Sequence, residues 1–404
     1  MSFENPRGLL RSHTLSDLKE PTLISFIDMA RWLAALMVMV GHLRNPLFLG
    51  WGDLAAGDRT WWVKIWFFVT GYHAEAVLVF FVLSGYLVGG LSAARGAEGK
   101  WQPGGYAIDR ISRLFIAFLP ALLLTVALDY AGSHFFGGTG LYDGTHPMVV
   151  QKMHGEVLQN RLTWPIFLGN AAMLQNYFGV PELGTNDPLW TLSTEFWFYV
   201  VFGLLLTAWL ARKPVVRWTC AFLGIAASAL LGIDFVLYLG MWLIGFLASQ
   251  LPRPPLSHPL IATGAMLAWL VVIRIKDSFF DAHLGYKFAS QYLLAALFGW
   301  IILSMRDRRI PWLTRVAPFN KFMADFSYSV YLIHFPVIWF ALSVLGTKTG
   351  IAGFRTAFRP TDPVGVATYV GMILGCLLVA WLFSRATEAH TAKLRQALRA
   401  RFVK

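Results

Sequence analysis

Charged residues and cysteines are both scarce in this 404-residue chain. Asp, Glu, Lys and Arg make up 14% of it, against about a quarter in soluble domains, and 56% of the residues are hydrophobic. The two cysteines, Cys220 and Cys376, lie in apolar runs without CxxC or Cys/His spacing, which argues against a disulfide framework and a zinc site. The composition instead indicates an integral membrane protein with no metal.

Several signatures of other protein classes are also missing. The sequence has no P-loop and no GxGxxG followed by an acidic residue, so it shows no nucleotide-binding motif. It has no low-complexity tract and no internal repeat of the kind that forms the inverted halves of many transporters. We therefore expect one integral domain.

Long apolar runs are what the chain has instead, with a mean hydropathy of +0.55. A helix that crosses a bilayer needs about 20 mostly apolar residues. The runs predict an all-α polytopic membrane protein. Two of them are separated only by Gly232, Ile233 and Asp234, which predicts a tight turn between antiparallel helices. The ten predicted transmembrane helices are 23–43, 74–94, 112–132, 190–211, 216–232, 234–250, 259–275, 288–304, 323–345 and 364–386.

The placement of Lys and Arg predicts the orientation. With both termini cytoplasmic, the cytoplasmic side holds about twice as many Lys and Arg residues as the other side, as the positive-inside rule requires. The same bias and anionic lipid explain the net charge of +12 better than nucleic acid does. The predicted parts are a cytoplasmic N-terminal segment at 1–22, a transmembrane domain at 23–386 and a basic cytoplasmic tail at 387–404.

Two long extracytoplasmic loops are predicted at 44–73 and 133–189. Each contains a short apolar piece, at 61–69 and 164–174, that is too short to cross a membrane. We interpret these pieces as interfacial or re-entrant segments.

The first predicted span, which contains MARWLAALMVMVGH, carries two ionisable side chains. Arg31 and His42 are eleven residues apart, which places them on one helix face about 16 Å apart along the axis. Asp28, three residues before Arg31, can pair with it. A snorkelling arginine and an interfacial histidine are the alternatives, but ionisable groups inside a membrane segment usually mark function.

Polar groups recur in other spans. Arg110 and Arg113 open the third span, where they are either topogenic anchors or a clamp for phosphates. Glu195 lies about one turn inside the fourth span, where a carboxylate needs a partner. His334 in the ninth span and Ser84 in the second are either helix-to-helix hydrogen-bonding groups or catalytic ones, and glycine at position 85 allows close backbone approach.

These features together resemble the acyltransferase 3 family of membrane acyltransferases. The resemblance is carried, in order, by the arginine and histidine of the first span, FFVLSGYL, the paired arginines, LWTLSTEFWFY and SYSVYLIHFP. It covers about residues 23–386. It implies a ten-helix bundle in a bacterial inner (plasma) membrane that takes an acyl group, usually acetyl, from cytoplasmic acetyl-CoA. The acceptor would be a hydroxyl of a glycan or lipid-linked sugar, often across the membrane.

The resemblance also implies Arg31, His42, Glu195, Arg110 and Arg113 as site residues, and other polar or aromatic positions of the sequence add further candidates. The expected catalytic residues are His42, Glu195 and Arg31. The expected donor-binding residues are Arg31, Arg110, Arg113 and Ser84, and the expected acceptor-binding residues are His73, Glu75, Trp190 and His334. The chain departs from the family pattern after Glu195, where phenylalanine follows instead of a second acid, and at Leu78, where an acidic residue is common. His73 and Glu75 are possible substitutes for the latter.

Acyl transfer fits these residues on chemical grounds. Attack of a hydroxyl on a thioester needs a base, a stabilised oxyanion and cations that hold the donor phosphates. Histidine, with an ordinary pKa of about 6.5, suits the base, and Glu195 could orient the His42 ring if the fold makes them adjacent. Transfer in one step and transfer through an acyl group on His42 or Ser84 both remain open.

Two other functional classes are also compatible with the sequence. A proton-coupled transporter would also bury Arg, His and Glu, and a structural membrane subunit would explain the hydrophobicity alone. Within the enzyme reading, succinyl or a longer acyl chain can replace acetyl. The sequence leaves open the oligomeric state and the acceptor, among exopolysaccharide, O-antigen, periplasmic glucan, peptidoglycan and a macrolide-like small molecule.

Overall fold

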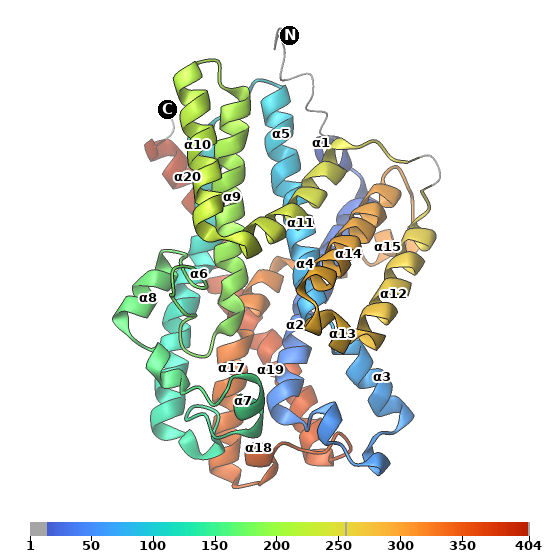
Figure 1. The fold of residues 1–404 in the computed structure, drawn as a ribbon, viewed down its shortest axis with the longest axis vertical. Coiled ribbons are helices and arrows are strands. Elements are labelled where there is room, and N and C mark those ends of the chain that lie inside the picture. Colours follow the sequence, from blue (N-terminus) through green and yellow to red (C-terminus); the bar gives the residue numbers. More distant parts are fainter. Residues whose placement is uncertain (1–13, 255–256, 403–404) are drawn as a thin grey trace.

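The computed structural model describes residues 14–254 and 257–402, and they form a bundle of helices (Figure 1). Within those ranges no strand forms, and one isolated β-bridge joins Phe48 to Phe358. Of the predicted N-terminal segment 1–22, residues 1–13 lie outside the described residues. The prediction of an all-α polytopic membrane protein is confirmed by the number and character of the helices.

Nine segments of the described chain are long and apolar enough to cross a membrane. They are Pro21–Leu47 (α2), Trp61–Ala97 (α3 to α5), Pro103–Phe135 (α6), Asp187–Leu210 (ending in α9), Pro214–Leu231 (α10), Ile233–Gln250 (α11), Leu284–Met305 (α14), Ser327–Thr349 (α17) and Pro363–Phe402 (α19 and α20). The remaining predicted span, 259–275, corresponds to the shorter apolar helix α12, Pro259–Ile275, which has 17 residues. The predicted turn between α10 and α11 is confirmed at Gly232, whose φ of +91° favours glycine.

Shorter helices complete the chain. Within the long segments they are α3 (Trp61–Val69), α4 (His73–Ser84), the π-helical segment η4 (Gly85–Gly89), α5 (Gly90–Ala97), α9 (Trp190–Leu210), α19 (Pro363–Ala386) and α20 (Thr391–Phe402). Between them lie α1 (Thr14–Asp17), α7 (Pro147–Lys152), α8 (Trp164–Ala171), α13 (Asp277–Ala282), α15 (Pro311–Arg315), α16 (Ala317–Asp325) and α18 (Gly353–Thr356). The 3-10 turns are Trp51–Asp53, Ala56–Asp58, Gly137–Thr139, Leu158–Arg161, Asp187–Leu189 and Glu388–His390.

The two short apolar pieces of the predicted loops form α3 and α8. These helices have nine and eight residues, so neither crosses a bilayer alone. Trp61 and Trp164, which begin them, are 74% and 76% exposed. Their interfacial position stays a prediction.

Glycines bring α11 into backbone contact with the α4–η4 segment. A Cβ on Gly85 would overlap the carbonyl oxygen of Trp242, and a Cβ on Gly245 would overlap that of Val82. The π-helical segment begins at this crossing. The close backbone approach predicted at Gly85 is therefore confirmed, and it places Ser84 against α11.

The first and last helices of the described chain mark one end of the bundle. The helices α1 and α20 lie at that end, and α3, α7 and α18 lie at the opposite end (Figure 1). The α20 helix packs on α6, where the buried carboxylate of Asp109 accepts hydrogen bonds from Arg399 at 2.7 Å and Arg95 at 3.2 Å. The region predicted only as a basic tail thus includes a docked helix, while its cytoplasmic location stays a prediction.

Candidate active site

A cavity of about 910 Å³ lies among α2, α4, α6, α9, α16, α17 and α20. We call it the basic cavity, because five cations and three carboxylates line it. These are Arg31, Arg110, Arg113, Lys321 and Arg395, with Glu195, Asp325 and Glu388. The fold thus brings together five residues that the sequence analysis placed in one site, namely Arg31, Ser84, Arg110, Arg113 and Glu195. Their roles stay predictions.

Most of the cations in the basic cavity have an acidic partner. Arg31 lies 3.7 Å from Asp28, so the pairing predicted for these two residues is confirmed. Arg113 donates to Glu388 at 2.9 Å, and Lys321 and Arg395 are paired with carboxylates in the same way.

Arg110 is different. Within the described chain it has no ion pair and no hydrogen bond, and its buried Nε lacks a partner. Its guanidinium lies 5.9 Å and 5.7 Å from the ring centroids of Tyr106 and Tyr199. Two aromatic faces compensate this half-buried cation only in part. The basic cavity is therefore suited to an anion that Arg110 can bind.

Glu388 is a residue that the sequence analysis missed. The residue is 7% exposed, and its carboxylate accepts hydrogen bonds from the backbone N–H of Ser329 at 2.9 Å and from Arg113. It thereby fixes the position of Arg113 on the cavity wall. The sequence feature that could have indicated Glu388 is that it is the one acidic residue between positions 387 and 404.

Ser84 and Glu195 belong to one hydrogen-bonded chain. The indole N–H of Trp242 donates to Ser84 Oγ at 3.0 Å, and Tyr199 donates to Glu195 Oε1 at 2.5 Å. Because the Tyr199 proton is used there, the 3.0 Å contact between Ser84 and Tyr199 has the serine hydroxyl as donor. The serine proton is thus directed along the chain toward Glu195. Neither Tyr199 nor Trp242 was among the site residues predicted from the sequence.

His42 is paired with His334, not with Glu195, at its Nδ1 atom. The distance from His42 Nδ1 to His334 Nε2 is 2.9 Å, and the rings are nearly parallel at 11°. His334 Nδ1 lies 2.8 Å and 3.0 Å from the carbonyl oxygens of Tyr331 and Val330. The side chain that contacts His42 Nδ1 is therefore His334, which is 1% exposed, and not Glu195.

The carbonyl contacts fix the tautomers of this histidine pair. A carbonyl oxygen only accepts, so His334 Nδ1 carries a hydrogen and Nε2 of the neutral ring is an acceptor. His42 Nδ1 must then donate to His334. In neutral His42 the basic lone pair is consequently on Nε2.

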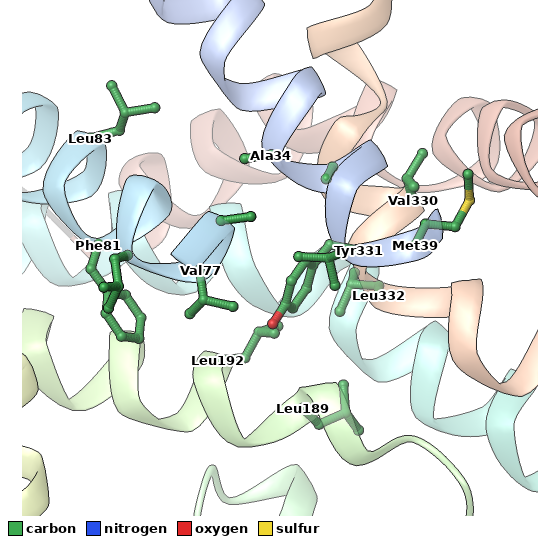
Figure 2. Packing of buried hydrophobic residues seen from close by; sticks show 14 of the residues in the cluster. Ala34, Met39, Val77, Phe81, Leu83, Leu189, Leu192, Val330, Tyr331 and Leu332 are labelled. Atoms are coloured by element: carbon green, nitrogen blue, oxygen red, sulfur yellow. The ribbon is translucent and has the colours of Figure 1, made fainter. Parts of the chain in front are cut away.

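One tyrosine separates the histidine pair from the basic cavity. Tyr331 and Thr191 both line the cavity, and their hydroxyl oxygens are 2.8 Å apart. The Tyr331 ring centroid is 6.0 Å from that of His334. Figure 2 shows Tyr331 reaching from α17 toward Leu192 on α9. The wall between cavity and histidines is therefore the thickness of one aromatic side chain.

The other predicted acceptor residues lie in different surroundings. The His73 ring is 5.3 Å from that of His42 and lines a second cavity. Glu75 is a half-buried residue in the first turn of α4. Trp190 begins α9 and packs against Tyr238 at 5.5 Å between centroids, outside the linings of both cavities. Among residues 14–254 and 257–402, no group of three or more His, Cys, Asp or Glu side chains is arranged to hold a metal ion.

Comparison with known proteins identifies the class. Residues 24–385 match the family model of the acyltransferase 3 domain, described as an acyltransferase domain. The chain is 22% identical over 299 residues to the peptidoglycan O-acetyltransferase OatA of Listeria monocytogenes, which covers 66% of this chain and 45% of that protein. It is 23% identical over 361 residues to the acyltransferase MdmB of Streptomyces mycarofaciens, covering 80% and 81% of the two chains.

A third relative belongs to a phage. The chain is 25% identical over 332 residues to the O-acetyl transferase of Shigella phage Sf6, covering 77% of this chain and 83% of the relative. No solved structure matches. Because the family match covers nearly the whole chain and the fold is a bundle of membrane-spanning helices, this protein belongs to the acyltransferase 3 family and is an integral-membrane acyltransferase.

Proposed function

We propose that the protein transfers an acetyl group from cytoplasmic acetyl-CoA to a hydroxyl of a glycan or lipid-linked sugar on the other side of the membrane. The observation that carries the proposal is the unpaired guanidinium of Arg110 in a basic cavity that ends one side chain away from His42 and His334. The cations of the cavity suit an anionic donor such as acetyl-CoA. The lone pair on Nε2 of neutral His42 suits the base that acyl transfer needs.

The basic cavity is the donor site in this proposal. Arg110 and Arg113 bind phosphate oxygens of the donor, since a guanidinium matches their geometry and keeps its charge. Arg31 adds positive charge to the same cavity from α2. A donor that enters here comes from the end of the bundle where α1 and α20 lie, which is the side predicted to be cytoplasmic.

His42 is the general base. The donor supplies a thioester carbonyl, and Nε2 of His42 takes the proton of the acceptor hydroxyl as its oxygen attacks that carbonyl carbon. The carbon–sulfur bond then breaks, and the imidazolium returns the proton to the departing thiolate. The products are an ester and a free thiol, so atoms and charges balance. His334 holds the ring through Nδ1, as the acidic member of a catalytic triad does.

Ser84 fits a supporting position better than an acyl-carrying one. Its hydroxyl accepts from Trp242 and donates to Tyr199, so both of its hydrogen-bonding directions are used inside the bundle. One-step transfer assisted by His42 is therefore the mechanism that we favour.

The test separates transfer from donor binding. Base-labile acetyl groups on surface glycans are measured in cells that carry wild type, His42→Ala or Arg110→Gln, and coenzyme A binding is measured on the purified proteins. His42→Ala is expected to abolish acetylation while binding coenzyme A like wild type. Arg110→Gln is expected to weaken coenzyme A binding at least about tenfold, since a charge-assisted hydrogen bond contributes roughly 1.5–3 kcal/mol.

Arg212→Gln is the matched control, because Arg212 is an exposed arginine outside both cavities. Normal acetylation by His42→Ala would reject His42 as the base. Unchanged coenzyme A binding by Arg110→Gln would reject the basic cavity as the donor site. Uptake of a substrate into proteoliposomes in the absence of any acyl-CoA would favour transport instead.

A further inference from the structure

A second cavity, of about 510 Å³, lies at the end of the bundle opposite α1 and α20. We call it the far cavity. Its lining includes Arg44 from the last turn of α2, which is 7% exposed. Arg44 donates to Thr70 Oγ1 at 2.8 Å, to the carbonyl oxygen of Phe67 at 3.2 Å and to Asn45 Oδ1 at 3.3 Å. All of these acceptors are neutral, so a buried positive charge faces the cavity without an acidic partner among the described residues.

A second guanidinium reaches the same place from α12. Arg274 lines the far cavity and lies against Gly71, where an added Cβ would stand 2.7 Å from the guanidinium carbon. Gly71 directly follows Thr70, the partner of Arg44, so both cations converge on two consecutive residues. The lining carboxylate, Asp53, is solvent-exposed. Arg44 is therefore the buried cation of the far cavity, and the half-buried Arg274 lies beside it.

The rest of the lining of the far cavity suits a sugar and lies close to His42, the proposed general base. Aromatic side chains of Phe48, Trp51 and Phe67 border the far cavity, and pockets for organic ligands combine such surfaces with a few placed polar groups. His73 also lines it and contacts His42 with its ring. A molecule bound here is next to the proposed general base.

From this geometry we infer that the acceptor is an anionic sugar, whose carboxylate or phosphate group is bound by Arg44 and Arg274. An oxyanion bound at Arg44 offsets the cost of burying that guanidinium, and Arg274 adds positive charge to the same cavity. Bidentate binding of such groups is characteristic of arginine. This inference rests on the proposed function, because it names the acceptor class of that site.

The experiment measures binding of three probes to the purified full-length protein by titration calorimetry. The probes are glucuronate, glucose 1-phosphate and uncharged glucose, and saturating coenzyme A is present to fill the basic cavity. We expect at least one anionic probe to bind saturably and at least about tenfold more tightly than glucose, as one charge-assisted hydrogen bond allows. Preference for glucuronate identifies an acidic sugar, and preference for glucose 1-phosphate identifies a sugar phosphate.

Two variants locate the effect. Arg274→Gln is expected to weaken binding of the preferred anion about tenfold or more, and Arg274→Lys, which keeps the charge, to weaken it less. Arg359→Gln is the matched control. Arg359 has a side chain 70% exposed, pairs with Asp58 at 3.8 Å and lies outside the far cavity, so anion binding should match wild type.

Equal binding of glucose and both anions would overturn the inference. So would unchanged anion binding by Arg274→Gln, or no saturable binding of either anion to wild type. Coenzyme A titrations into wild type and Arg110→Gln are run in parallel. If coenzyme A does not bind while the Arg274 effect persists, the proposed donor site fails and the anion site stands.

Discussion

Replacing His334 tests the assignment of the base nitrogen on His42. In the His334→Phe variant the ring that lies against His42 is kept, but the Nε2 acceptor 2.9 Å from His42 Nδ1 is lost. The Nδ1–H of His42 is then left without this acceptor, and the ring is free to adopt the tautomer with its hydrogen on Nε2. That tautomer cannot accept a proton from the hydroxyl.

The size of the effect follows from one partly buried hydrogen bond. Losing the acceptor of such a bond costs about 1–3 kcal/mol, which is roughly 5- to 150-fold in rate. We expect kcat of His334→Phe to fall about 10- to 100-fold while KM for acetyl-CoA stays unchanged, because His334 is outside the basic cavity. His334→Gln retains a side-chain acceptor and should lose less.

The assay is steady-state transfer of labelled acetyl by purified protein, with thermal unfolding recorded for each variant. A merely structural role would lower the melting temperature, change KM for acetyl-CoA, and affect His334→Phe and His334→Gln alike. A kcat of His334→Phe within about twofold of wild type would refute the proposed orientation of His42.

Two further predictions concern stability. Gly85→Ala pushes the backbones apart at the crossing with α11 and should destabilise the protein by about 1–3 kcal/mol. Gly371→Ala is the control, because a Cβ there meets nothing within 4 Å, and it should leave stability unchanged. Equal melting temperatures of the two variants would contradict the close crossing. Burial, and then the charge of Asp187, raise the pKa of Glu182 to about 7 from 4.5. The folded state therefore binds a proton that the unfolded state releases between pH 4.5 and 7, so stability falls as pH rises through that window, by about 3 kcal/mol. Glu182→Gln should raise the melting temperature at pH 8 but not below pH 4.5; a difference independent of pH would contradict this.

Much of the fold was predictable because its signals are local. Apolar runs of membrane-spanning length indicate helices wherever they occur, and the turn at Gly232 follows from the short interval between two such runs. The pairing of Arg31 with Asp28 follows from their three-residue spacing. None of these predictions needed knowledge of which helices are neighbours.

The site contacts that were missed are long-range. His42 and His334 are 292 positions apart, and Ser84 and Trp242 are 158 apart, so periodicity in either helix does not reveal the pairing. Glu388, just before α20, and Arg395 on α20 reach the basic cavity because this part of the chain packs against α6, and a basic tail does not indicate where it docks. Glu195 was a candidate to orient the His42 ring if the two were adjacent, but in the fold its hydrogen-bond donor is Tyr199 on the same helix.

The most direct test of the central claim uses sealed inside-out membrane vesicles that contain the host's own glycans. Acetyl-CoA labelled in the acetyl group is supplied only outside, on the former cytoplasmic face. We predict base-labile label on glycans inside the vesicles with wild type and none with His42→Ala. Label that appears only on the outer face, or internal label that forms equally with His42→Ala, would contradict transfer from the basic cavity across the bundle through His42.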